Sequence, residues 1–185
     1  MQTKLITGAV ALCLALVGTG AAVAAQSGPA PKRATIRAVQ TVKVKVNRYV
    51  LDGMRWQKDT YSVRSGGTVR VVNDAPDEGP HTFTFVKKSD LPRTPMQILQ
   101  HCRICEELGK AHGADPHSDG PPKFKFLENG VGQNTPPNFD QPGDSALIAP
   151  RKGSSINLPV TAKKGKTLYF MCLIHPWMQG KLLVR

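Results

Sequence analysis

The feature that most constrains the fold of this chain is a short segment near its C-terminal end that carries three closely spaced metal-binding side chains. Cys172, His175 and Met178 follow a strand-like run at Cys-x2-His-x2-Met spacing. A thiolate and a thioether favour Cu(I), whereas imidazole binds both Cu(I) and Cu(II), so this donor set suits a copper ion that changes its oxidation state. A four-ligand site needs one more imidazole, which the fold must bring to this segment from elsewhere.

His81 is the histidine that we expect to supply the fourth ligand. It begins residues 81–86, where apolar and polar residues alternate, and it is the only histidine outside the C-terminal segment in strand-like sequence. We therefore predict one copper ion held by His81, Cys172 and His175, with Met178 as a weak axial ligand. The alternatives are a structural thiol at Cys172, a surface histidine at position 81, and a methionine that only packs in the core.

Short alternating segments with turns between them predict an all-β fold. Val42, Val44 and Val46 alternate with polar residues, which predicts a half-buried strand. The same alternation returns in residues 156–160, and residues 167–172 form the strand that would deliver the cysteine. About eight such strands are expected, which favours a Greek-key β-sandwich.

Residues 88–145 interrupt the alternating pattern, and we expect them to form a long, partly helical insertion in the sandwich. Thr94, Pro95 and Gln97 are a helix start signal, with a capping residue, a proline at the first position and a glutamine at the third. The helix is predicted over residues 95–112 and is followed by a Gly/Pro-rich surface loop. Such a loop could lie beside the metal site.

The N-terminal region has the pattern of an export signal. Residues 1–25 contain one charge, Lys4, followed by an uncharged apolar run that ends in small residues suited to cleavage before Gln26. Residues 26–40 are predicted to be a flexible linker, which leaves residues 41–185 as the folded domain. We expect an exported protein, periplasmic or extracellular, or a membrane-anchored one if the signal is not cleaved.

The chain has a net charge of +12 that is unevenly distributed. Residues 146–185 contain basic residues and no acidic ones, whereas residues 88–145 contain both. A basic domain favours a protein partner with an acidic docking surface or an anionic membrane surface, although the charge would also simply keep an exported protein in solution. Nucleic acid is not an expected partner, because only 6% of the residues are aromatic and no base-stacking motif is present.

A second group of histidines and cysteines lies in the insertion. Its members are His101, Cys102, Cys105, His112 and His117. Such crowding suggests a second metal site, with Zn or Cu as the ion. The alternatives are free thiols or a disulfide between the two cysteines. Two cysteines that are three positions apart within one helix fit a disulfide poorly. Haem attachment of the usual kind is excluded, because Glu106 rather than a histidine follows the second cysteine.

These residues together resemble the cupredoxins, the small blue-copper electron carriers. The resemblance covers residues 41–87 and 146–185. The short ligand spacing, with proline directly after the histidine, is similar to that of amicyanin, whereas plastocyanin-like loops are longer. The resemblance implies a Greek-key sandwich with one type 1 copper, and small cupredoxins lack an insertion such as residues 88–145. The matching elements are residues 66–73, the Pro-His pair at 80–81, residues 168–172 and the ligand loop that follows them.

We predict an exported, monomeric type 1 copper protein that carries single electrons between redox partners. The alternative is a copper-handling protein for storage, sensing or delivery, with the insertion as a second metal site or lid. An enzyme is not expected, since multicopper oxidases and copper nitrite reductases need further histidine-rich centres, and this chain has five histidines and no His-x-His pair. The N–H of Ile174 is expected to point at the Cys172 sulfur and to raise the reduction potential. Residues 173–177 are expected to surround His175 with an apolar docking patch.

Overall fold

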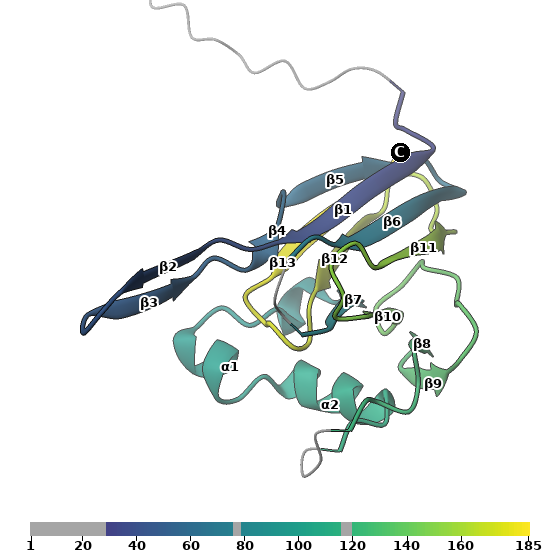
Figure 1. Ribbon diagram of the computed structural model, residues 1–185. Coiled ribbons are helices and arrows are strands. Elements are labelled where there is room, and N and C mark those ends of the chain that lie inside the picture. The colour runs from purple at the N-terminus through teal and green to yellow at the C-terminus, as the bar shows by residue number, and fades with distance from the viewer. Residues whose placement is uncertain (1–28, 76–78, 116–119) are drawn as a thin grey trace, which may run out of the picture.

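Two β-sheets pack face to face in this chain, and a partly helical segment covers the outer face of one of them (Figure 1). The computed structural model describes residues 29–75, 79–115 and 120–185. The predicted export signal, residues 1–25, and His117 of the predicted second metal site lie outside these residues. In the part of the chain that is described, no helix is long and apolar enough to cross a membrane. The predicted all-β sandwich with a partly helical insertion is confirmed.

The smaller sheet contains β1 (Arg33–Val39), β4 (Arg55–Trp56), β6 (Gly67–Asn73) and β11 (Ser155–Val160). Their order in the sheet is β11-β6-β1-β4. β1 runs parallel to β6, whereas β11 and β4 pair antiparallel with β6 and β1. The N-terminal strand is therefore held between two others and is part of the sandwich.

The larger sheet contains β5 (Thr60–Val63), β7 (His81–Val86), β8 (Phe126–Glu128), β9 (Val131–Gln133), β10 (Ser145–Ile148), β12 (Thr167–Met171) and β13 (Gln179–Val184). Their order is β5-β13-β12-β7-β10-β8-β9. β12 pairs with β7 although the two are far apart in sequence, and both pairings of β7 are antiparallel. This crossover between distant strands brings the two halves of the predicted metal site to one end of the sheet.

Aromatic side chains fill the space between the sheets. Trp56 packs against Phe83 and Phe170, with ring centroids 6.1 and 5.8 Å from its own. Phe85 and Phe139 extend the cluster, and all five rings are buried. Because aromatic rings pack at preferred angles, such a cluster fixes how the two sheets lie against each other.

The insertion contains the 3₁₀ helix η1 (Lys88–Asp90) and the helices α1 (Pro95–Leu99) and α2 (Arg103–Ala111). The predicted helix start is confirmed, because Thr94 and Gln97 form a capping box and Pro95 occupies the first turn. The prediction of a single helix over residues 95–112 is wrong, since the chain leaves the helical conformation between α1 and α2.

A disulfide gives the physical reason for the break between the two helices. Cys102 and Cys105 are bonded, with Cα atoms 5.2 Å apart. Cys102 has a non-helical backbone (φ −78°, ψ 83°) and immediately precedes α2. Two cysteines three positions apart inside one continuous helix fit a bridge poorly, so the first cysteine lies just outside the helix.

α2 covers the outer face of β7 and β12. Val86 and Met171 of these strands form a buried cluster with Leu108 of α2, Leu127 of β8 and Leu173. β7 is consequently buried on both faces, whereas its alternating sequence alone would predict one exposed face. The insertion therefore covers the back of the sheet beside the metal-binding end.

The predicted flexible linker over residues 26–40 is wrong for residues 33–39, which form β1. Ala34, Ile36 and Ala38 point into the core in strict alternation and are buried. Two of these three residues are alanines, which are depleted in strands, so the segment resembles a linker in composition while it packs as a strand.

The strand predicted from Val42 onward is exposed on both faces and is not half-buried. β2 (Val42–Lys45) pairs with β3 (Tyr49–Asp52) in a separate two-stranded hairpin. Figure 1 shows this hairpin projecting from the sandwich. Val44 and Val50 are paired across it and are 65% and 70% exposed. Alternation predicts a strand but does not show what covers its apolar face.

The Gly/Pro-rich loop predicted after the helix contains a second hairpin, formed by β8 and β9. Its turn is Asn129-Gly130, with φ values of 53° and 79°. An Asn-Gly pair with two positive φ angles is the preferred two-residue turn between antiparallel strands. This dipeptide is the sequence signal that would have identified the hairpin.

Candidate metal centre

The end of β12 and the start of β7 bring three predicted ligands together. The strands are antiparallel neighbours, with Met171 opposite Thr84, so Cys172 just beyond β12 lies close to the first residues of β7. The Cys172 Sγ atom is 3.9 Å from Nδ1 of His81 and 3.6 Å from Nδ1 of His175. The prediction that folding brings His81 to the C-terminal segment is confirmed.

The chosen ligand atoms of these three residues lie within 4.8 Å of one another. Within residues 29–75, 79–115 and 120–185, this is the only group of three or more histidine, cysteine or acidic side chains with such spacing. Two imidazoles and one sulfur around a common point are the donor types of a trigonal copper site. The residues that are present therefore fit a soft, redox-active metal.

Backbone hydrogen bonds close the loop that carries Cys172, His175 and Met178. The N–H of Cys172 donates to the carbonyl of Met178 at 3.0 Å, and the N–H of Met178 donates to the carbonyl of His175 at 2.8 Å. Met178 is itself buried at the edge of the core. The loop thus holds its side chains in place through its own backbone.

Two tryptophans fasten this loop to β4 and the residue before it. Nε1 of Trp56 donates to the carbonyl of Met178 at 3.0 Å, and Nε1 of Trp177 donates to the carbonyl of Met54 at 2.9 Å. The two bonds run in opposite directions between the same two segments. Sequence analysis did not identify Trp56 or Met54 as part of the site, because nothing in their local pattern indicates a contact with a segment more than a hundred residues away.

The imidazole of His81 is set up to remain neutral. Burial, and secondly the neighbouring His175, lower the pKa of His81 to about 4. Its Nδ1 faces the Cys172 sulfur, while Nε2 is buried and has no hydrogen-bond partner among the described residues. At neutral pH the ring therefore has a free lone pair, which is the form that binds a metal ion.

The thiol of Cys172 is fully buried, and burial raises its pKa. Hydrogen bonds to the sulfur from the N–H groups of Thr82, His175 and Ile174, and from the Thr82 hydroxyl, oppose that rise. The Thr82 N–H lies 3.3 Å from the sulfur. A buried sulfur surrounded by hydrogen-bond donors is suited to carry negative charge when a cation replaces its proton. The predicted contact from Ile174 is among these donors.

Mild acid should destabilise the metal-free protein. Because the pKa of His81 is about 4 in the folded chain and 6.5 in the reference state, the unfolded chain binds more protons below pH 6.5. The free energy of unfolding should therefore be highest above pH 6.5 and fall by about 3 kcal/mol toward pH 4. Urea unfolding at a series of pH values measures this fall.

A His81→Asn variant is the control for that titration. Burial also lowers the pKa of His112, so part of the acid sensitivity should remain in the variant. The fall between pH 6.5 and pH 4 should nevertheless be clearly smaller than in the unchanged chain. An identical pH profile in the two proteins would contradict a buried, neutral His81.

The second predicted metal site is not formed. Cys102 and Cys105 are joined in a disulfide, so neither sulfur is available as a thiolate ligand. His112 is buried, and both of its ring nitrogens already have protein partners. His101 is exposed on the surface, and His117 lies outside the described residues. The prediction of Zn or Cu held by the insertion was therefore wrong as regards the two cysteines and His112.

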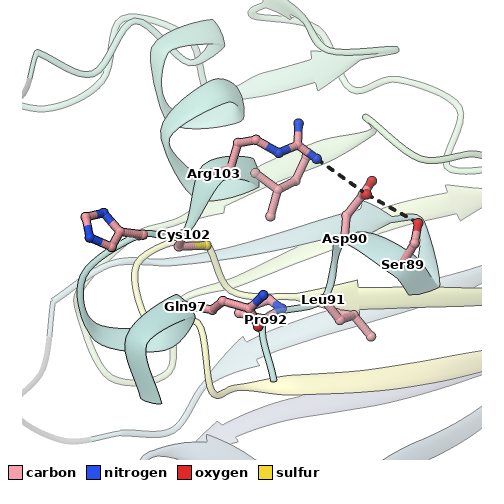
Figure 2. Close-up of a pocket in the computed structure, with 9 residues that line it drawn as sticks. Ser89, Asp90, Leu91, Pro92, Gln97, Cys102 and Arg103 are labelled. Atoms are coloured by element: carbon pink, nitrogen blue, oxygen red, sulfur yellow. Dashed lines mark hydrogen bonds and ion pairs between the residues drawn. The ribbon is translucent and has the colours of Figure 1, made fainter. Parts of the chain in front are cut away.

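The start of α2 instead borders a small pocket, shown in Figure 2. Its volume is about 110 Å³, and its lining includes Asp90, Gln97 and Cys102. Arg103 closes one side, where its guanidinium lies 3.7 Å from the Asp90 carboxylate. Pockets for cofactors or drug-sized ligands are several times larger, so this one has room for only a few water molecules.

No protein-family model matches the chain, and no curated protein matches it. Similar solved structures include a reduced auracyanin from Roseiflexus castenholzii (17% identity, 85% of this chain and 99% of that one, TM-score 0.44). They also include the blue copper protein auracyanin A from Chloroflexus aurantiacus (16%, 83% and 99%, TM-score 0.42) and a purple cupredoxin from Nitrosopumilus maritimus (13%, 82% and 99%, TM-score 0.41). Because identities and TM-scores are this low, the chemistry of the centre is inferred from its own donor atoms.

Proposed function

We propose that this chain binds one copper ion through His81, Cys172 and His175, with Met178 as a weak axial ligand, and carries single electrons between redox partners. The observation behind the proposal is the position of two Nδ1 atoms, 3.9 and 3.6 Å from a fully buried sulfur. Copper at this point would supply a one-electron couple between Cu(I) and Cu(II).

The surroundings of the centre favour fast electron transfer, because they keep the ligands in one arrangement. The ligand loop is closed by its own backbone bonds, and Trp56 and Trp177 tie it to the opposite segment. His81 and Cys172 are completely buried at the ends of two paired strands. Side chains held this firmly change position little when the charge of the ion changes, so little reorganisation is needed.

Electrons would enter and leave through the partly exposed ring of His175. Ile174 and Trp177 flank it on the surface and are 44% and 40% exposed, whereas Leu173 and Pro176 are buried. The Trp177 ring lies edge-on to His175, with centroids 5.4 Å apart. The predicted apolar patch is thus reduced to two residues at the edge of the ligand loop, where a partner could dock without displacing the histidine.

The projecting hairpin extends this docking surface. Met54 lies two residues after the end of β3, and its carbonyl accepts the hydrogen bond from Trp177 of the ligand loop. The hairpin carries exposed valines together with Lys43, Lys45 and Arg48. Basic and apolar groups together suit a partner protein whose docking face combines acidic and apolar side chains.

Export of the protein is part of the proposal. The apolar N-terminal sequence predicts it, and the disulfide between Cys102 and Cys105 supports it, because disulfides persist in oxidising compartments outside the cytosol. The same disulfide weighs against the copper-handling alternative. That function would need the cysteines of the insertion as metal ligands, and they are bonded to each other.

Loading the purified protein with Cu(II) tests the proposed function. We expect one copper per chain, an intense blue absorption band from the thiolate–Cu(II) bond, and a reversible one-electron couple. The Cys102→Ser/Cys105→Ser variant is the matched control and should also bind one copper with the same spectrum. A colourless protein that binds only Cu(I), or more than one copper per chain, would favour copper handling instead.

The Ile174→Pro substitution should lower the reduction potential. Proline removes the N–H that donates to the Cys172 sulfur, so the thiolate donates more strongly to Cu(II). A net hydrogen-bond contribution of about 1 kcal/mol corresponds to a decrease of about 40 mV for a one-electron couple. Voltammetry measures the change, and Ile174→Ala, which retains the N–H, should leave the potential nearly unaltered. An equal or higher potential in the proline variant would rule out this role of Ile174.

A further inference from the structure

A cavity large enough for a small organic molecule lies between the insertion and the strands β10 and β11. Its volume is about 730 Å³, and pockets that bind cofactors or drug-sized molecules measure about 300 to 1,000 Å³. Residues 120–125, which return from the insertion toward β8, form one wall, and residues 147–156, which run from β10 into β11, form the other. In Figure 1, β8 and β11 lie on the other side of the molecule from the projecting hairpin of β2 and β3.

A single buried asparagine at the end of β6 fixes the wall between β10 and β11. The side-chain amide of Asn73 donates to the carbonyls of Ala149 and Pro150 at 3.2 and 3.3 Å. Its backbone N–H donates to the carbonyl of Ser154 at 2.9 Å, and its own carbonyl accepts the N–H of Gly153 at 2.7 Å. This wall is therefore held in one conformation by the fold itself.

Hydrogen bonds also hold the opposite wall against the sheet. The carbonyl of Lys125 accepts the N–H of Leu147 at 2.8 Å. The N–H of Lys125 donates to the side-chain oxygen of Asn134 at 3.3 Å. Because the fold sets both walls, a molecule that enters the cavity does not have to order them, and its binding avoids that loss of conformational entropy.

The middle of the cavity is apolar. Pro121 and Pro122 line it from the insertion, and Leu147, Ile148 and Ile156 line it from β10 and β11. Leu147 and Ile156 are only partly buried. A molecule with an apolar body would therefore cover apolar surface that is now in contact with water, and this burial favours binding.

Three basic side chains line the same cavity, and no acidic side chain of the described residues does. The three are Lys123, Lys125 and Arg151. The ion pairs within that part of the chain use Arg37 and Arg103 as their cations, so no described carboxylate is paired with the three basic residues of the cavity. Positive side chains around an apolar space attract a negatively charged group and select against a cation.

We propose that this cavity binds a small organic anion. Its apolar body would lie between the prolines of the insertion and the aliphatic side chains of β10 and β11. Its carboxylate, sulfonate or phosphate group would reach Lys123, Lys125 or Arg151. A few polar or charged groups around an apolar pocket are the usual means by which such a site orients its ligand.

The site adjoins the strand that carries a proposed copper ligand, but it does not depend on the ion. Pro80 lines the cavity and directly precedes His81, and Ile148 lies opposite His81 in the pairing of β10 with β7. His81 itself is fully buried and does not line the cavity. The inference is thus tested on protein purified without added metal, and its failure would leave the proposed copper function untouched.

A sulfonated dye and its uncharged counterpart test the expected ligand class. 1-Anilinonaphthalene-8-sulfonate combines an aromatic body with one negative charge, and N-phenyl-1-naphthylamine has the same body without the sulfonate. Calorimetry should show one sulfonated dye per chain and an affinity for the uncharged dye that is lower by about 10-fold or more. Equal affinities for the two dyes, or no saturable binding of either, would overturn the proposal.

Removal of the positive charges locates the sulfonate. The Lys123→Gln/Lys125→Gln/Arg151→Gln variant should bind the sulfonated dye about 10-fold more weakly and the uncharged dye as before. The matched control is Lys43→Gln/Lys45→Gln/Arg48→Gln, which removes three positive charges from the other apolar surface, the projecting hairpin. This control should bind both dyes normally. The reverse result would place the dye on the hairpin and overturn the proposal.

A larger side chain inside the cavity locates the apolar body. Leu147→Trp fills part of the space and should abolish binding of the sulfonated dye, whereas Val131→Trp, at an exposed position on β9 outside the cavity, should not. Should Leu147→Trp fail to fold, NMR of the unchanged chain decides, because the methyl signals of Ile148 and Ile156 should shift as the dye saturates the protein. Methyl signals that stay in place, or full binding by a folded Leu147→Trp variant, would overturn the proposal.

A protein segment is the other class of occupant that these experiments must separate. A short peptide of alternating glutamate and leucine offers the same combination of negative and apolar groups. It should displace the dye only weakly, since a flexible peptide loses conformational entropy when it binds. Tighter binding of the peptide than of the dye would identify a protein segment as the occupant and overturn the assignment to a small molecule.

Discussion

Replacing Cys172 with serine is expected to abolish the blue absorption and to weaken copper binding by more than about 100-fold. Even changes to residues that only hydrogen-bond a metal ligand cost about 10- to 100-fold in affinity, and this substitution removes a proposed direct ligand. A cysteine thiol can lose its proton and bind a metal ion as a thiolate, whereas a serine hydroxyl keeps its proton. Competition with a copper chelator measures the affinity, and the visible spectrum reports the thiolate bond.

The interpretation requires that the variant is folded. Serine is smaller than cysteine and can still accept the Thr82 N–H that now points at the sulfur, so the unfolding transition should remain cooperative. A parallel His175→Ala variant removes a proposed ligand from the exposed end of the loop without touching the sulfur. Blue protein from Cys172→Ser would show that the sulfur is not the ligand, and the proposed centre would have to be abandoned.

Replacing Trp56 with alanine should cost about 3–5 kcal/mol of folding free energy. The indole is 2% exposed, packs against Phe83 and Phe170 and lies 6.3 Å from the His81 ring, measured between centroids. Its removal leaves a cavity between the sheets and takes one of two hydrogen-bond donors from the Met178 carbonyl, which keeps the N–H of Cys172. Urea unfolding of the metal-free protein measures the cost, and weaker copper binding is expected to accompany it.

Trp177→Ala is a close control, because both indoles donate one hydrogen bond to a backbone carbonyl across the same pair of segments. Trp177 is 40% exposed, so its loss should cost only about 1 kcal/mol. The difference between the two costs in folding free energy then measures the contribution of burying the Trp56 indole, because each variant loses one such hydrogen bond. Similar costs for the two substitutions would mean that the loop, and not the aromatic core, carries the stability of this end of the sandwich.

The cluster of His81, Cys172 and His175 was predictable from the sequence because its chemistry is concentrated in a few residues. Cys172, His175 and Met178 have a distinctive spacing, and His81 is the only other histidine in a strand-like segment. The sandwich followed from alternation, which reports directly on burial of one strand face. Packing against distant segments has no such local signal, so β1 was mistaken for a linker and the exposed hairpin for part of the core.

The buried hydrogen bonds that link His112, Ser145, Thr84 and Thr82 could not be predicted for a related reason. Threonines at positions 82 and 84 are ordinary strand residues, and serine at 145 reads as a turn residue. Their contact depends on the register that places Ser145 opposite Thr84, and on the return of the insertion that brings His112 over both. The sequence did show His112 as unusual, but its company of cysteines and histidines suggested a metal and not a hydroxyl partner.

Under the proposed function, the covering of the larger sheet by α2 also determines from which side electrons can tunnel. Tunnelling rates fall steeply with distance, and a helix layer adds about 10 Å between the back of the sheet and any molecule outside it. The imidazole of His175 has no such layer over its edge. A partner that met the molecule on its helical side would therefore exchange electrons far more slowly, and the protein should react in one orientation even with partners that bind elsewhere on its surface.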